Sequence, residues 1–233
     1  MSISLAHLSK ILDYRSMFLQ GLLVTVLLSF LTVLIGFVLA FLLAMMHLSR
    51  YRVLRCISGA YVQFVRCTPM LVQVFLVYYV LFGFIKLPQF TFFGFIQFER
   101  FFPAVVALSL NSGGYMSDVI RGGIEGVDRG QTEAARSLGM SSGQTMYHII
   151  LPQAIKNILP AVANEFVTII KESSICYTIG VQDIMFNVKS VQSATFIIAE
   201  PLLVATFLYF CLCFPTSKII QHVERRMRAS DKR

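Results

Sequence analysis

The chain has 233 residues, of which 56% are hydrophobic and only 14% are charged, and its net charge is +8. A soluble domain carries about 25% charged residues, so this composition indicates an integral membrane protein and excludes a disordered, collagen-like or disulfide-stapled chain. The basic residues stand just outside apolar runs and form no continuous basic stretch, which argues against nucleic acid as a partner.

Five apolar stretches follow one another along the chain, and each predicts a membrane-spanning helix. The first is uncharged from Ser16 to Met46, which exceeds the ~20 residues that cross a bilayer. Because it is too long for the core of a signal peptide, we expect it to remain as a helix. The five expected spans are 17–47, 60–86, 101–121, 157–181 and 194–218.

Between the second and third spans lies a loop, 86–100, that is rich in phenylalanine. Aromatic side chains often line the boundary between membrane and water. We therefore expect the loop at the membrane surface, with a gate or a contact to another protein as the alternatives.

The segment 122–156, called the coupling loop below, is too polar to cross a membrane. Its apolar residues recur at helical spacing and predict short amphipathic helices, which we expect Pro152 to end. With Arg121–Lys156, the 50–55 segment and the tail in the cytoplasm, 13 Lys and Arg lie there and 5 lie outside. That asymmetry predicts an outside N-terminus and a cytoplasmic C-terminus.

The fourth span is apolar but contains Asn164, Glu165, Lys171 and Glu172. A charge inside a span costs about 2.5–3.5 kcal/mol on insertion scales, so such side chains face a protein interior or a water-filled cavity. We consider two alternative roles for Glu165. It lines a translocation cavity and pairs with a cationic substrate, or it forms a structural ion pair with Arg66 or Lys171.

Further polar groups lie in the second and third spans. Gly113 and Gly114 permit either close helix approach or a local break in the third span, and simple helix packing is the alternative. Thr68 and Pro69 predict a kinked helix start. The candidate substrate-pathway residues are Glu165, Asn164, Asn111, Ser112, Tyr115, Thr68, Gln73 and Arg66.

No set of residues for catalysis or metal binding is apparent. The four histidines are scattered without an H-E-x-x-H pattern, the five cysteines form no C-x-x-C pair, and there is no G-x-S-x-G. The sequence also lacks G-x-x-x-x-G-K-[S/T], so it has no loop for a nucleotide phosphate. We therefore expect no catalytic residue, no metal and no cofactor in this chain.

One motif in the coupling loop is specific. Glu133-Ala134-Ala135 is followed after three residues by Gly139, and after nine more by Ile149, one residue and Leu151-Pro152. It resembles the EAA loop of permease subunits in ATP-binding-cassette (ABC) importers, and every fixed position matches. An ordinary amphipathic loop helix is the alternative.

The resemblance extends over about Gly21 to Arg228 and is similar to the polar amino acid branch of that family. Two departures are mild: Gly114 replaces a more usual alanine, and the run from Lys171 to Ile175 replaces K-D-T-S-L. The segments that carry the resemblance are 111–115, 121–124, 130–131, 66–69 with Gln73, 164–166 and 171–174.

The resemblance implies an all-α, type I importer permease fold with five spans and a cytoplasmic coupling helix, forming a single domain over 1–233. It implies a multi-pass protein of the bacterial plasma (inner) membrane that moves polar amino acids, with basic ones such as arginine, lysine or histidine favoured by Glu165. The implied partners are a second permease, identical or homologous, ATPase subunits that bind ATP and Mg, an external amino-acid-binding protein and the lipid bilayer. The alternative function is an autonomous channel or an ion-coupled carrier. The residues expected to contact the ATPase are Glu133, Ala134, Ala135, Gly139, Ile149, Leu151 and Pro152.

Overall fold

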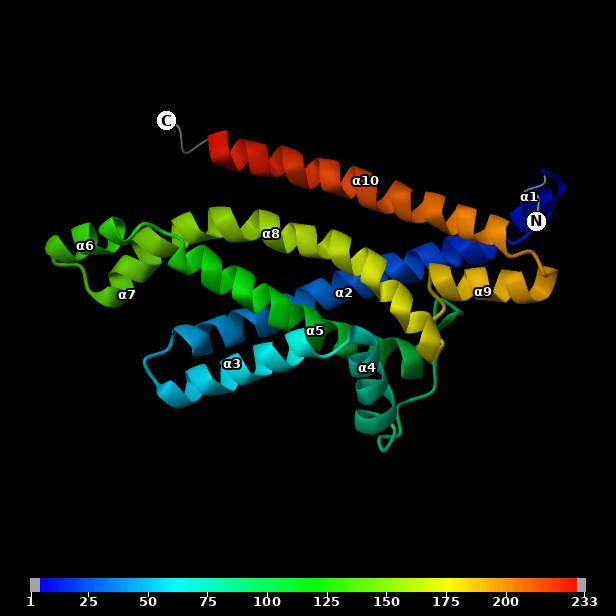
Figure 1. The fold of residues 1–233 in the computed structure, drawn as a ribbon, viewed down its shortest axis with the longest axis horizontal. Helices are drawn as coiled ribbons and strands as arrows, with labels where there is room; N and C mark the ends of the chain where they lie inside the picture. Colours follow the sequence, from blue (N-terminus) through cyan, green and yellow to red (C-terminus); the bar gives the residue numbers. More distant parts are fainter. Residues whose placement is uncertain (1–4, 230–233) are drawn as a thin grey trace.

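The computed structural model describes residues 5–229 and shows an elongated, almost entirely helical molecule (Figure 1). The long helices run along its long axis, with α6 and α7 at one end and α1 and α9 at the other. The predicted all-α class is confirmed. The α-helices are α1 (Leu5–Leu12), α2 (Arg15–Leu48), α3 (Arg52–Cys67), α4 (Met70–Phe75), α5 (Phe98–Glu125), α6 (Arg129–Ser137), α7 (Ser142–Thr145), α8 (Leu151–Glu172), α9 (Ile184–Thr195) and α10 (Ala199–Ala229).

Three short helical segments of other geometry continue these helices. They are the π-helices η1 (Leu76–Leu81) and η2 (Met146–Ile150) and the 3₁₀ helix η3 (Ser173–Ile179). Within the described residues the strands are β1 (Thr91–Phe92) and β2 (Ile96–Gln97), which pair as a small antiparallel hairpin. This hairpin lies in the phenylalanine-rich loop, where Phe90, Phe92 and Phe98 pack ring against ring.

Helix α5 is the centre of the molecule and packs most extensively against α2. Fifteen of its 28 residues are buried, including glycines, serines and Asn111. Apolar clusters surround it toward both ends, one around Leu108 and Cys176 and another around Met116 and Ile158. Because α5 is enclosed by protein, it can carry polar side chains that a lipid-facing helix could not.

The second predicted span is sharply bent. Helix α3 ends at Cys67, and the segment Met70–Leu81 continues at 110° to it. Thr68 has an extended backbone, which is the conformation that a following proline imposes. The predicted kink at Thr68 and Pro69 is therefore confirmed.

By length and apolar character, two helices of the described residues could each cross a membrane: α2 and the Ala199–Met227 part of α10. The bent pair of α3 with Met70–Leu81 would be a third. Helices α5 and α8 are long enough, with 28 and 22 residues, but their polar side chains make them less apolar. The five-span count stays a prediction.

Several boundaries differ from the sequence-based prediction, most clearly at Pro152. We expected this proline to end the helical pattern of the coupling loop. Instead η2 continues directly into α8, and Pro152 lies in its first turn. A proline is tolerated there because a first-turn N–H has no acceptor within the helix.

The ends of the last two predicted spans also move. Helix α8 stops at Glu172 and η3 follows it, so 157–181 is not one continuous helix. Similarly, 194–218 divides into the end of α9 and the longer α10. Asp183 begins α9 by accepting a hydrogen bond from the Phe186 backbone N–H at 2.7 Å, a helix cap that the hydropathy pattern does not reveal.

Candidate translocation pathway and coupling loop

Glu165 on α8 is held by Ser112 on α5. The Ser112 hydroxyl is completely buried and donates to Glu165 Oε1 at 2.8 Å. Among residues 5–229, no lysine, arginine or histidine lies within ion-pair distance of this carboxylate. The structural ion pair with Arg66 or Lys171 that we considered is therefore absent from the described part of the chain.

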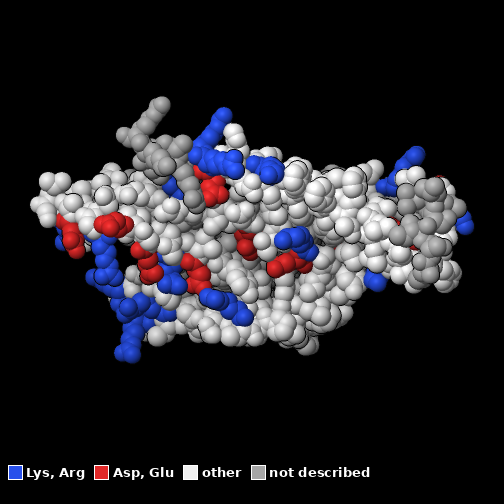
Figure 2. Space-filling model, turned by 45° about the horizontal axis from the view of Figure 1, so that its top comes forward, with Lys and Arg blue, Asp and Glu red and all other residues white. Residues whose placement is uncertain are grey.

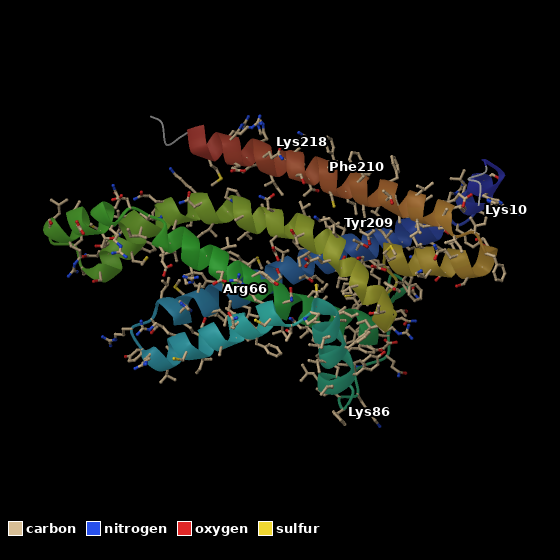
Figure 3. The ribbon with its side chains drawn as sticks, viewed as in Figure 1. Lys10, Arg66, Lys86, Tyr209, Phe210 and Lys218 are labelled. Carbon is tan, nitrogen blue, oxygen red and sulfur yellow. The ribbon has the colours of Figure 1, made fainter. Side chains whose placement is uncertain are left out.

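Arg66 has a different partner. Its Nη1 donates to Asp118 Oδ2 at 2.7 Å, and Arg121 donates to the other oxygen of Asp118 at 3.2 Å. Arg121 also pairs with Glu125 at 2.9 Å. Figure 3 shows Arg66 between α3 and α5, so this network joins the bent helix to the central one. The sequence pattern placed Asp118 at the end of a span but gave no sign of this pairing.

Gln73 closes the break between α3 and α4. Its amide nitrogen donates to the Val65 carbonyl at 2.9 Å, the Thr68 carbonyl at 3.0 Å and the Thr68 hydroxyl at 2.8 Å. Its oxygen accepts from Asn111 Nδ2 at 3.1 Å. A helix that ends leaves carbonyls without acceptor bonds, and this buried side chain satisfies two of them. Three predicted pathway residues thus hold the kink together.

The glycine pair in α5 allows close helix contact and does not break the helix. A Cβ atom at Gly113 would lie 2.8 Å from Leu39, and one at Gly114 would lie 2.9 Å from Val65. Helix α5 is continuous through both residues. The predicted close approach is confirmed, while a local break at this point is wrong.

The remaining two pathway candidates are separated from these contacts. Asn164 is exposed on α8, although it adjoins Glu165 in sequence. Tyr115 on α5 has 44% of its surface exposed. The structure therefore divides the predicted set into Ser112 with Glu165, Gln73 with Asn111 and Thr68, Arg66 with Asp118, and two exposed side chains.

The coupling loop begins with a well-defined short helix. Asp128 accepts a hydrogen bond from the Gly130 backbone N–H at 2.7 Å and caps α6. Glu133 and Ala134 are exposed, whereas Ala135 is buried at 4% exposure. Only the first two of the three motif residues are therefore available for a contact with another protein.

Gly139 reverses the chain after α6. Its φ is +85°, and the backbone N–H groups of Gly139 and Met140 donate to the Arg136 and Ala135 carbonyls. This is the Schellman arrangement, which favours glycine because it lacks a Cβ. The predicted turn between two short helices is confirmed. The residue before it, Leu138, is 84% exposed.

After the turn, Ser141 and Gln144 form a capping box that starts α7. Ile149 is half-buried, while its neighbour Ile150 enters the core cluster around Met116. Leu151 is half-buried and Pro152 is exposed at the start of α8. The loop is therefore a helix–turn–helix fixed rigidly onto α8, with no flexible joint at Pro152.

The sequence-based candidates omitted a cavity beyond the end of α8. It has a volume of about 730 Å³ and contains both charges that follow Glu165 on the same helix. Figure 2 shows charged side chains in the middle of a largely uncharged face. Its lining residues are Met70, Lys171, Glu172, Ser174, Ile175, Tyr177, Met185, Thr206 and Tyr209. The run Lys171–Ser174 was the available signal, but sequence alone placed no α10 residue opposite it.

An elongated, largely apolar helical bundle with a polar helix–turn–helix that carries the EAA motif at one end is typical of the membrane-embedded permease component of an ABC importer. The chain belongs to the family described as "Binding-protein-dependent transport system inner membrane component", which matches residues 33–229. It is thus an integral inner membrane protein, and the recognition based on the EAA loop is confirmed.

Characterised relatives cover nearly the whole chain. The arginine transport system permease protein ArtQ of Bacillus subtilis (strain 168) is 39% identical over 213 residues, which are 91% of this chain and 93% of the relative. The putative glutamine transport system permease protein GlnP of Rickettsia typhi is 36% identical, with 96% of this chain and 98% of the relative covered. These relatives are permease subunits, as the sequence predicts for this chain.

Solved structures agree with the fold. One described as "Crystal structure of an amino acid ABC transporter with histidines" has a TM-score of 0.86 and 37% identity, covering 97% of this chain and 100% of the other. An inward-facing MetNI methionine ABC transporter has a TM-score of 0.75 at 16% identity, covering 92% of this chain and 98% of the other, which supports the fold alone.

Proposed function

We propose that this chain is the permease subunit of an ATP-driven importer of polar amino acids, with a preference for cationic ones. A second permease, ATPase subunits and an external amino-acid-binding protein complete the complex. ATP binding closes the ATPases, which move the coupling loops and reorient the spans in alternating access. The names of the relatives support amino acids as cargo and include both arginine and glutamine.

The preference for cations depends on one observation, the state of Glu165. Its Oε1 is oriented by Ser112, and no basic side chain of residues 5–229 neutralises it. A carboxylate in a low-dielectric site attracts a cation strongly. A lysine, arginine or histidine substrate supplies that cation only while it passes, which suits transport.

The exposed face of the coupling loop supports the ATPase contact. Glu133, Ala134 and Leu138 project from α6 with little cover from the rest of the chain. Because Ile150 packs into the core cluster around Met116 and η2 runs directly into α8, a movement imposed on α6 can be passed to α8. The alternative function, a channel or ion-coupled carrier without an ATPase, finds no support among the relatives.

The test replaces Glu165 by glutamine, which keeps the shape and removes the charge. Uptake of labelled arginine, lysine and glutamine is measured with the complete complex in liposomes. We expect uptake of the cationic amino acids to fall about tenfold or more, because a hydrogen bond to a charged group contributes about 1.5–3 kcal/mol, and glutamine uptake to change less than about threefold.

Asp118→Asn provides the matched control. It also removes one half-buried carboxylate charge, but that carboxylate is already paired with Arg66 and Arg121. It should lower uptake of every substrate equally through loss of the network. If Glu165→Gln behaves in the same way, Glu165 is structural and the preference for cations is wrong.

A further inference from the structure

Two opposite charges, Lys171 and Glu172, line the 730 Å³ cavity at the end of α8. Within residues 5–229, neither Lys171 nor Glu172 forms an ion pair or a side-chain hydrogen bond. Both side chains are exposed and border this cavity, and charges in a membrane-embedded segment that face a cavity mark substrate pathways. A basic and an acidic group beside the same cavity favour a ligand that carries both a negative and a positive charge.

The rest of the lining suits a small polar molecule with an apolar part. Met70 and Ile175 provide apolar surface, Tyr177 and Thr206 provide hydroxyl groups, and Tyr209 contributes its ring, since its hydroxyl oxygen is buried. Figure 3 shows Tyr209 on the side of α10 that faces the other helices. The volume falls within the range of about 300–1,000 Å³ that is usual for small-ligand sites.

We propose that this cavity binds the head group of an α-amino acid, with Lys171 receiving its carboxylate and Glu172 its ammonium. The residue pair is the smallest arrangement that recognises a zwitterion through both charges. Recognition through the head group does not depend on the side chain of the substrate. Every α-amino acid that the complex carries should therefore require Lys171 and Glu172.

The position of Glu165 extends this site toward the substrate side chain. It precedes Glu172 by seven residues, which is almost two helical turns, so both carboxylates lie on the same face of α8, about 10.5 Å apart along the axis. A head group at Glu172 directs a long side chain along α8 toward Glu165. Both parts of the inference rest on the proposed function as an amino acid importer, but only this second part rests on the preference for cations.

The test measures binding of L-arginine, L-glutamine and agmatine to the purified permease–ATPase complex by isothermal titration calorimetry. Agmatine is arginine without its carboxylate, so it probes Lys171 separately. We expect Lys171→Gln and Glu172→Gln to raise the Kd of every amino acid that binds the unmodified complex by about tenfold or more. Lys171→Gln should leave the weaker agmatine binding within about twofold.

Lys189→Gln is the matched control, because Lys189 is exposed on α9 and is absent from the cavity lining. It should leave every Kd unchanged. The double variant Lys171→Glu with Glu172→Lys keeps the net charge and should restore part of the affinity, which guards against a variant that merely misfolds.

The possible outcomes separate this inference from the proposed function. If glutamine binds and arginine does not, but Lys171→Gln still weakens glutamine, the preference for cations fails and the head-group site stands. If Lys171→Gln and Glu172→Gln leave all amino acid affinities unchanged, the head-group site is wrong. It is also wrong if both variants instead lose a co-purifying zwitterionic lipid, because the cavity would then hold a lipid head group.

Discussion

Replacing Gln73 by methionine should weaken the kink between α3 and α4 severely. Methionine has a similar length and shape but cannot exchange hydrogen bonds. The change would leave three buried groups without their partner: the Val65 carbonyl, the Thr68 carbonyl and the Asn111 amide. A buried polar group left unsatisfied costs about 1–3 kcal/mol. We therefore expect the free energy of unfolding to fall by at least about 3 kcal/mol.

The measurement is thermal unfolding of the detergent-solubilised protein. For a chain of this size, 3 kcal/mol corresponds to a decrease in Tm of about 6–12 °C. Gln63→Met is the matched control, because Gln63 is exposed on α3 and its side chain reaches only Cys67 Sγ, at 3.1 Å. It should change Tm by no more than about 2 °C, as surface substitutions do. Equal Tm values for the two variants would show that Gln73 does not stabilise the kink.

Two further predictions concern the coupling loop and the topology. Gly139→Asp should abolish most substrate-stimulated ATP hydrolysis while the protein still inserts into the membrane, because the turn at φ +85° favours glycine and the change adds a charge beside the exposed face of the loop. Gly143→Asp, where an added Cβ meets open space, is the control, and unchanged stimulation in Gly139→Asp would contradict the docking role. In a cysteine-free background, Glu133→Cys and Arg136→Cys should react with an impermeant maleimide only from the cytoplasm. Phe93 has 74% of its surface exposed, and Phe93→Cys should react only from outside. The reverse labelling would overturn the predicted orientation.

The features that sequence predicted well are those set by local chemistry. Thr68 and Pro69 fix a kink because the proline ring restricts the residue before it. Gly139 marks a turn because the αL conformation favours a residue without a Cβ. The length of α2 follows from an uncharged apolar run. Each of these signals lies within a few neighbouring residues, so a single sequence suffices to find it.

The features that sequence missed depend on residues far apart in the chain. Arg66 and Asp118 are 52 positions apart and meet only because α3 packs against α5. The cavity at Lys171 needs Thr206 and Tyr209 from α10 to close it. The error at Pro152 has another origin: proline ends a helix from within but is accepted in its first turn, and the sequence did not place the start of α8.

The distribution of partners among the buried polar groups separates structural roles from functional ones. Each polar side chain taken out of water must be satisfied or must lower stability. On α4 and α5, the buried Gln73 and Asn111 are satisfied within the chain, and on α3 the exposed Arg66 is paired with Asp118, so the kink and helix packing explain their presence. On α8, Ser112 donates a hydrogen bond to one oxygen of Glu165, while Lys171 and Glu172 are exposed and form no ion pair or side-chain hydrogen bond within residues 5–229. All three charges belong to one helix that is continuous with the coupling loop, so under the proposed function α8 is the element that links a movement imposed by the ATPase to the binding of substrate.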